Sequence, residues 1–288
     1  MSGKFCSREN WEKRQQLHYR VREFFLKRGV LEIDAPVLSE AGGTDPHIDY
    51  FETASPTLYL ATSPEFFMKR LLASGFGDCF ALTHAFRKGE SGALHRQEFN
   101  IAEWYRIGFS AEELQQEVLD LVNHITGFSL PLKRTTWKQA FEKVDMEKLK
   151  EEHKNWSVEE IEDYAMSSII EPNLGRNCAE FITEYPSQRA ALAKICENTA
   201  HRFELYVNGI ELCNGYQELI DASEQRKRFL DDAKKRRKMG KQVPKIDEDF
   251  LIALVKGGMP ECSGVALGLD RLYMLALGKK NIEDVLLW

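Results

Sequence analysis

The sequence predicts an α+β protein in which helices flank a largely antiparallel sheet. Strand-like runs follow one another with short turns between them, and runs with a 3.6-residue apolar period lie among them. No internal repeat or low-complexity linker divides the chain. With 288 residues, 43% of them hydrophobic, it is long enough to fill a core, and one domain over residues 1–288 fits best.

Helices are predicted where apolar side chains recur with the helical period. The first ends at residues 27–29, two basic residues and a glycine, and its apolar face consists of Leu17, Val21, Phe24 and Phe25. The second begins at a capping box of Ser110 with Glu113 and ends at Gly127. Its apolar residues are Leu114, Val118, Leu121, Val122 and Ile125. Residues 147–170 are expected to be helical and to lie on the surface.

Strands are predicted for five runs rich in β-branched and aromatic residues: 58–62, 79–86, 98–105, 180–185 and 202–219. In the last run Asn208-Gly209 predicts a hairpin with a two-residue type I′ turn. The expected register consists of the pairs Val207–Ile210, Tyr206–Glu211 and Glu204–Cys213.

This hairpin brings two carboxylates to one face of the sheet. Glu204 and Glu211 are diagonal neighbours, about 7–8 Å apart or less. They repel one another unless a cation lies between them, and Mg²⁺ completed by substrate phosphates suits such a place. Two solvated glutamates on an exposed hairpin would give the same pattern.

The run SGVALGLDRLYMLALG, residues 263–278, predicts a strand that leads into a helix. Small residues at 264, 266 and 268 allow the strand backbone to lie close to a ligand. Arg271 stands in the first turn of the helix beside free backbone N–H groups, a position that suits a polyphosphate. A glycine-containing turn with a solvated arginine is the alternative interpretation.

Residues 86–105 contain the end of one strand, a polar loop and a second strand. The two-residue period places Phe99, Ile101, Glu103 and Tyr105 on one face of the second strand. Arg87 suits a bidentate contact with a phosphate, Phe99 suits stacking on a base, and Glu103 suits an ammonium group.

Composition narrows the classes of function. The net charge of −6 argues against a chain that mainly grips nucleic acid, and no segment is apolar enough to span a bilayer. The N-terminal residues MSGKFCSREN lack the apolar region of an export signal, and the six cysteines form no CxxC pair. We therefore expect a cytoplasmic protein without disulfides or zinc.

Four segments occur in the order found in class II aminoacyl-tRNA synthetases of the lysyl type, and the chain resembles that family over nearly its whole length. Residues 263–278 resemble motif 3, residues 86–105 resemble motif 2, and residues 11–40, which include Pro36, resemble the dimer-forming motif 1. Residues 62–72 resemble the lysyl-type segment whose glutamate receives the substrate's α-amino group. The resemblance implies ATP and Mg²⁺ as cofactors and a homodimer through motif 1.

Within the family, the chain resembles the truncated lysyl-tRNA synthetase paralogues that attach lysine or (R)-β-lysine to a lysine of translation elongation factor P. It enters motif 1 by about residue 11, so no anticodon-binding domain is expected. VALG in motif 3 has Ala266 where lysyl-tRNA synthetases have glycine, and IIEPNLG at 169–175 is another mark of the paralogues. In these paralogues the alanine goes with a β-amino rather than an α-amino lysine. Elongation factor P is then the implied partner, and tRNA is not expected to be one.

The resemblance implies roles for individual residues. The ATP site would consist of Arg87, Glu90, His95, Phe99, Glu211, Leu212, Gly268 and Arg271. Within it, Arg87 and Arg271 would act on the phosphates as catalytic residues, and Phe99 would stack on adenine. Glu204 and Glu211 would hold Mg²⁺. The lysine pocket would consist of Ser63, Glu65, Glu103, Tyr105, Asn214, Tyr216, Glu218 and Ala266, with Glu103 and Glu218 as charge partners of an ammonium.

The motif 2 loop departs from the family pattern. After Arg87 the family has Asn-Glu, whose glutamate contacts adenine, whereas this chain has Lys88-Gly89 and its nearest acid is Glu90. After His95 the family usually has Asn-Pro, whereas this chain has Arg96-Gln97. We expect Glu90 to replace the missing glutamate after a shift of one residue.

Other interpretations remain open from the sequence. The chain is alternatively a catalytic domain that charges tRNA, or an inert paralogue that acts as a regulatory subunit. The basic run at 234–241 fits either a contact with an acidic partner or RNA, or a solvated helix end that stops at Gly240.

Overall fold

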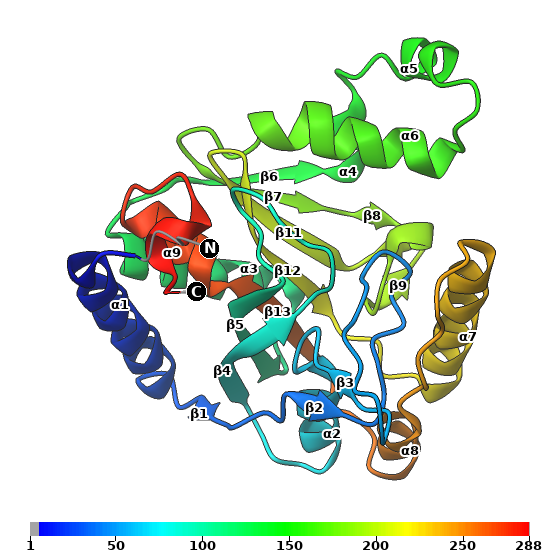
Figure 1. Ribbon diagram of the computed structural model, residues 1–288, viewed down its shortest axis with the longest axis horizontal. Helices are drawn as coiled ribbons and strands as arrows, with labels where there is room; N and C mark the ends of the chain where they lie inside the picture. Colours follow the sequence, from blue (N-terminus) through cyan, green and yellow to red (C-terminus); the bar gives the residue numbers. More distant parts are fainter. Residues whose placement is uncertain (1–5, 288) are drawn as a thin grey trace.

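The computed structural model describes residues 6–287, and an eight-stranded sheet runs through the centre of this part of the chain (Figure 1). Its order is β1-β4-β5-β13-β12-β11-β7-β6. The edge pairs β1–β4 and β6–β7 are parallel, and the pairs between them are antiparallel. This arrangement confirms the predicted α+β class.

The strands of this sheet are β1 (Leu31–Glu32), β4 (Cys79–Phe86), β5 (Glu98–Ile107), β6 (Leu132–Thr136), β7 (Ala179–Thr183), β11 (Arg202–Val207), β12 (Ile210–Gln217) and β13 (Cys262–Gly268). Two small sheets consist of β2 (Leu38–Ser39) with β3 (Tyr59–Leu60), and of β8 (Tyr185–Pro186), β9 (Ile195–Cys196) and β10 (Thr199–Ala200). The α-helices are α1 (Arg8–Leu26), α2 (Glu65–Ala73), α3 (Ala111–Thr126), α4 (Trp137–Phe141), α5 (Met146–Glu152), α6 (Val158–Ala165), α7 (Ala222–Lys238), α8 (Glu248–Lys256) and α9 (Leu269–Ala276). A π-helix, η1 (Met166–Ile170), and the 3₁₀ segments η2 (Glu171–Asn173), η3 (Ser187–Arg189) and η4 (Ile282–Val285) complete the described elements.

Most predicted elements form where the sequence places them. The capping box of Ser110 with Glu113 is present, and Gly127 ends α3 in the left-handed conformation that glycine favours. The predicted run 180–185 is wrong as one strand, because Glu184 has a positive φ of 55° and separates β7 from β8. The predicted helical run 147–170 is interrupted by the turn between α5 and α6, where Ser157 caps a new helix.

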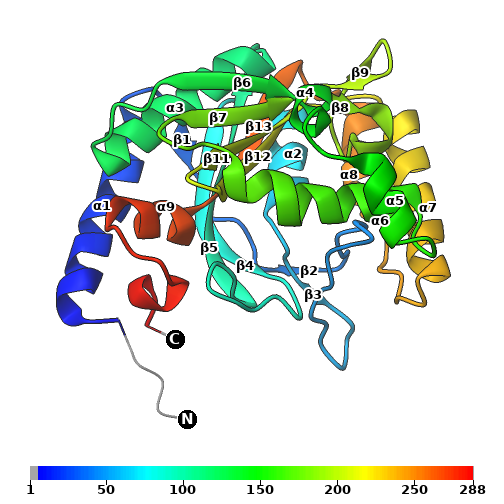
Figure 2. The same ribbon diagram turned by 90° about the horizontal axis from the view of Figure 1, so that it is seen from above.

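Helices cover the two faces of the sheet differently (Figure 2). Helices α1, α3 and α9 pack on one face, where Phe25 stacks on Phe80 at a ring distance of 4.5 Å and lies 5.0 Å from Trp104. On the other face α2, α7 and α8 pack over the β4 and β5 side of the sheet, around Met68, Phe229 and Phe250. A cavity lies over the middle of this second face.

The basic run at 234–241 forms the end of α7 and the turn after it. Arg236 is buried and donates to the carbonyls of Asp45 and Ile48, and Gly240 ends the helix with a φ of 69°. The run therefore ends a helix at Gly240 as expected, but it is not wholly solvated, because Arg236 is buried and holds the loop at 45–49. Contact of the run with a partner stays a prediction.

The described residues contain no helix that is both long and apolar enough to cross a lipid bilayer. Residues 1–5 of the N-terminal stretch, which we expect to carry no export signal, lie outside the described part of the chain.

Asp270 joins three elements that are distant in sequence. Its carboxylate accepts from Arg14 of α1 at 2.6 Å and from the backbone N–H of Asn100 in β5 at 2.7 Å, and both charged side chains are almost fully buried. Because Arg271 follows directly, this ion pair fixes the start of α9 against both the sheet and α1.

We predict that Asp270→Asn lowers the free energy of unfolding by about 3–5 kcal/mol, because Arg14 is then buried without a counter-charge. Urea denaturation measures the change. The control is Glu9→Gln, which removes an exposed ion pair with Lys13 and should cost less than about 1 kcal/mol. Equal costs for the two variants would contradict the assignment of Asp270 as a structural hub.

Candidate active site

A cavity of about 910 Å³ opens over the middle of the sheet. Strand alternation builds it: Ala102 and Trp104 of β5 enter the core beneath α1 and α3, whereas Phe99, Glu103 and Tyr105 line the cavity. Every residue that the resemblance assigned to ATP, the metal or lysine lines this one cavity. The structure therefore brings together the whole predicted set.

One end of the cavity is rich in cationic and aromatic groups. The guanidinium of Arg87 lies 5.1 Å from the ring centre of Phe99. Arg271 donates to the backbone carbonyl of Glu211 at 2.9 Å and lies 2.6 Å from Nε2 of His95. Burial and the charges of Arg271 and Arg87 lower the pKa of His95 to about 4, so this histidine is neutral at pH 7. Two arginines beside an aromatic face suit the phosphates and the base of a nucleotide.

Two residues of the motif 2 loop that depart from the family pattern, Gly89 and Gln97, contact each other. Gly89 has a φ of 85°, and its N–H donates to the side-chain carbonyl of Gln97 at 3.0 Å. This hydrogen bond joins the two sides of the loop between β4 and β5. Glu90 lines the cavity 3.8 Å from Arg87, and its role in place of the family's glutamate stays a prediction.

The hairpin of β11 and β12 carries the two glutamates proposed for the metal. The pairs Val207–Ile210 and Tyr206–Glu211 are as predicted. The predicted pair Glu204–Cys213 is wrong, because a β-bulge lies between Leu205 and Tyr206, so that Glu204 is opposite Asn214. Cys213 consequently enters the core with the side chains of Leu205 and Val207. Glu204 and Glu211 still face the cavity.

A third carboxylate, Glu171 of η2, belongs to this acidic group. The hydroxyl of Tyr206 lies 2.7 Å from Glu204 and 3.3 Å from Glu171. Burial, followed by the charges of Glu211 and Glu204, raises the pKa of Glu171 to about 7. Burial also raises the pKa of Glu211, against the opposing effect of Arg271. The mutual repulsion shows that added positive charge would be stabilising here.

Among the described residues, no group of three or more His, Cys, Asp or Glu side chains is arranged to hold a metal by itself. Mg²⁺ is commonly held by one or two carboxylates plus substrate phosphates, so the donors Glu204 and Glu211 fit an ion that arrives with a nucleotide.

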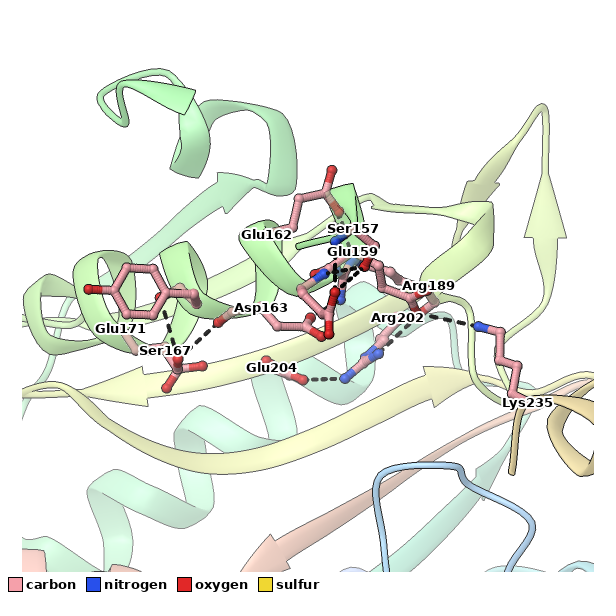
Figure 3. Close-up of polar contacts among 12 residues, drawn as sticks. Ser157, Glu159, Glu162, Asp163, Ser167, Glu171, Arg189, Arg202, Glu204 and Lys235 are labelled. Carbon is pink, nitrogen blue, oxygen red and sulfur yellow. Dashed lines mark hydrogen bonds and ion pairs between the residues drawn. The ribbon is translucent and has the colours of Figure 1, made fainter. Parts of the chain in front are cut away.

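Arg202 lies beside Glu204 (Figure 3) and contacts residues at both ends of the cavity. It forms an ion pair with Glu204 and donates to Oδ1 of Asn214 at 3.2 Å. Its Nη1 donates to the backbone carbonyl of Arg189 at 2.9 Å. Burial alone would raise the pKa of Glu204, but Arg202 and neighbouring tyrosines hold it below its usual range.

Arg189 in turn holds α6 beside the cavity, as Figure 3 shows. Its guanidinium binds the carboxylates of Glu162 at 3.0 Å and Asp163 at 2.6 Å. Glu159 of α6 also lies 3.4 Å from Lys235 of α7. These contacts fix the segment that carries Glu171.

The other end of the cavity gathers buried carboxylates around one buried lysine. Lys69 Nζ lies 2.6 Å from Glu65 Oε1 and 2.6 Å from Glu218 Oε2. Glu103 accepts from the hydroxyl of Tyr105 at 2.7 Å through Oε1. Two further buried oxygens, Oε2 of Glu103 and Oε1 of Glu218, have no hydrogen-bond partner. Buried oxygens without partners are costly, so they mark where a donor is expected.

Burial raises the pKa of both unsatisfied acids. It raises the pKa of Glu103 well above the usual range, with Glu65 as the next cause. It raises the pKa of Glu218 to about 7, although Lys69 opposes the shift. Both carboxyls would be ionised more readily beside a bound cation.

β13 forms the floor of this pocket with small side chains. Ala266 is paired with Glu103 on one side and with Asn214 on the other. At Gly264 a Cβ atom would lie 2.2 Å from a Tyr105 ring carbon and 2.5 Å from Glu218 Oε1. Only glycine leaves Tyr105 and Glu218 in place at that position.

Three residues around the cavity were missed in the sequence, although two of them stand at a recognisable spacing. Lys69 follows Glu65 by four residues on one helix, and Arg202 precedes Glu204 by two residues on one strand. Glu171 lies in the block 169–175, for which the sequence predicted no role.

The comparisons with known proteins agree with this geometry. The family model for class II tRNA synthetases (D, K and N) matches residues 5–288. The chain belongs to this family. It is 41% identical to an elongation factor P–(R)-β-lysine ligase of Avibacterium paragallinarum, over 92% of this chain and 90% of that protein. Ligases of the same name from Haemophilus influenzae and Salmonella arizonae are each 40% identical, over 96% of this chain and 94% of theirs.

We predict that Gly264→Ala raises the KM for the amino-acid substrate at least tenfold, because the added methyl group displaces Tyr105 and Glu218. ATP binding serves as the internal control, since Gly264 lies on the acidic side of the cavity. Fluorescence titration with a nucleotide analogue and steady-state kinetics measure the two effects. An unchanged KM for the amino acid would show that this end of the cavity does not bind it.

Proposed function

We propose that this protein is an ATP-dependent ligase that activates lysine or (R)-β-lysine as an acyl-adenylate and transfers it to a lysine side chain of translation elongation factor P. The observation that carries the proposal is the pair of buried, unpartnered carboxylate oxygens of Glu103 and Glu218 in a cavity that also contains Arg87 and Arg271. The names of the relatives at about 40% identity support the choice of acceptor and amino acid.

The acidic end of the cavity matches an amino acid with two ammonium groups. Glu103 and Glu218 supply unsatisfied acceptors, and Glu65 lies with them around Lys69. With its ammonium groups held there, the substrate carboxylate extends toward Arg87 and the nucleotide.

Activation requires the carboxylate to attack the α-phosphorus of ATP in line, which forms the acyl-adenylate and releases pyrophosphate. Arg87 would neutralise charge that develops on the α-phosphate, Arg271 would hold the rest of the triphosphate, and Phe99 would stack on adenine. No general base is needed, because the attacking carboxylate is already ionised; positioning and charge neutralisation supply the catalysis.

Mg²⁺ would be held by Glu204 and Glu211 and would offset phosphate charge when bound. In the second half-reaction the neutral ε-amine of the acceptor lysine attacks the acyl carbon. An amide forms, AMP leaves, and the amine loses one proton.

Further features of the chain support a cellular location, an oligomeric state and a choice of acceptor. The six cysteines are free thiols, which supports a reducing cytoplasm. Tyr19 and Leu26 of α1 and Leu31 of β1 are more than half exposed, which supports a homodimer through the predicted motif 1 surface. We favour elongation factor P over tRNA as the acceptor, because a chain with a net charge of −6 has no general attraction to the phosphate backbone of tRNA.

Glu211→Gln is expected to abolish ATP–pyrophosphate exchange that depends on lysine and Mg²⁺, because it removes one of two metal carboxylates and the partner of Arg271. Isotope exchange measures the rate. Glu261→Gln serves as control, since that exposed glutamate pairs with Lys194 outside the cavity. Full exchange by Glu211→Gln would remove Glu211 from the metal site.

Ala266→Gly is expected to raise the use of α-lysine relative to β-lysine, because the methyl group lies between Glu103 and Asn214 at the amino end of the pocket. A methyl-sized change in a pocket is worth about 1–3 kcal/mol, so the ratio of kcat/KM values should change at least about fivefold. An identical ratio in the wild type and the variant would locate discrimination elsewhere.

The acceptor is tested by intact-mass spectrometry of elongation factor P after reaction with ATP and each lysine isomer. Aminoacylation of bulk tRNA is assayed in parallel. We expect a mass increase of one lysyl group on the factor and no charged tRNA. Charged tRNA beside an unmodified factor would contradict the proposed acceptor.

A further inference from the structure

Lys69 does not line the cavity but lies fully buried behind two carboxylates that do, Glu65 and Glu218, and the function proposed above gives it no role. It lies on α2 with no exposed surface, equally close to Glu65 and Glu218 at 2.6 Å. Burial by itself would lower the pKa of Lys69, but Glu218 and Glu65 outweigh it and keep the amine protonated. A permanent positive charge thus lies directly behind the carboxylates of a pocket that would bind a cationic substrate.

The net charge of the pocket can be counted from its three carboxylates and the lysine behind them. Glu65, Glu103 and Glu218 together carry three negative charges when ionised, and Lys69 removes one of them. Two negative charges remain for the two ammonium groups of a lysine isomer. Without Lys69, the buried carboxylates of Glu103 and Glu218 and the partly exposed carboxylate of Glu65 would repel one another.

We propose that Lys69 sets the charge of the amino-acid pocket, so that the pocket matches a substrate with two ammonium groups. This inference rests on the function proposed above. Lys69 acts through Glu65 and Glu218 and is therefore a positioning residue, not a group that reacts.

The other titratable groups around this pair come from several elements. They are Glu103 and Tyr105 of β5, Tyr216 of β12, Cys262 of β13 and Cys79 of β4. Burial raises the pKa of each of these groups above its ordinary value. The two tyrosines and two thiols therefore stay neutral near pH 7, and the carboxyls dominate the pH response.

The first test is the pH profile of kcat/KM for lysine in pyrophosphate exchange, which reports ionisations of the free enzyme. In the wild type kcat/KM should rise as Glu218 ionises near pH 7. Lys69→Met removes the charge that lowers the pKa of Glu218, so the rise should move to higher pH by at least one unit. At pH 7 kcat/KM should then fall about tenfold or more.

Lys133→Met is the matched control. Lys133 lies 2.5 Å from the buried Glu180 and does not line the cavity, so its removal leaves a buried glutamate without touching the pocket. Its pH profile should coincide with that of the wild type. If the profile of Lys69→Met also coincides with the wild type, Lys69 has only a structural role and the inference is overturned.

The second test compares two variants at Glu65 and also applies if Lys69→Met alone does not fold. Glu65→Gln leaves the pocket with one net negative charge, whereas Glu65→Gln combined with Lys69→Met restores two. We expect the double variant to have a lower KM for lysine than Glu65→Gln alone, at least threefold, and circular dichroism verifies that both fold. A higher KM in the double variant would overturn the charge count.

Different results test the proposed function and the role of Lys69. If the wild type shows no lysine-dependent exchange, the proposed function is wrong. If the wild type is active and Lys69→Met retains its pH profile, only the role of Lys69 is wrong.

Discussion

The cavity depends on the central strand β13, which has small side chains on one face and large ones on the other. Gly264, Ala266 and Gly268 face the cavity, while Val265 and Leu267 enter the core. β13 pairs with β5 on one side and with β12 on the other. Because the side chains on its cavity face are small, they leave space above β13. Carboxylates from β5 and from β12 and the residue after it can gather there, and a substrate can lie across the middle of the sheet.

The same strand leads directly into α9, which places Arg271 at the nucleotide end of the cavity. Asp270 anchors that start to α1 and β5, so the position of Arg271 is tied to the packing on the opposite face of the sheet. Arg202 forms a second link, since it contacts both Glu204 of the proposed metal site and Asn214 of the amino-acid pocket. The two ends of the cavity are thus mechanically connected through buried polar contacts.

Much of the fold and of the site could be predicted from the sequence, because at those positions the local sequence signals agree with the fold. The turn at Asn208-Gly209, the capping box at Ser110 and the alternation along 98–105 each define local geometry, and the structure has all three. The residues assigned by resemblance all line one cavity.

What could not be predicted depends on tertiary contacts. A bulge between Leu205 and Tyr206 places Cys213 in the core, and nothing in a simple two-residue period signals it. From the sequence, Lys69 is an ordinary helical partner of Glu65. Only the approach of Glu218, which follows β12, shows that Lys69 is buried behind the pocket. The hydrogen bond between Gly89 and Gln97 likewise appears only when the loop closes.

The central claim is that this acidic pocket recognises two ammonium groups at once. Isothermal titration calorimetry with lysine, (R)-β-lysine, norleucine and 6-hydroxynorleucine tests it, because the last two carry a single ammonium group. A pocket with buried acceptors rejects ligands that leave them unpaired, so the monocations should bind at least about 100-fold more weakly than a lysine isomer. Binding of norleucine within tenfold of both lysine isomers would contradict the account.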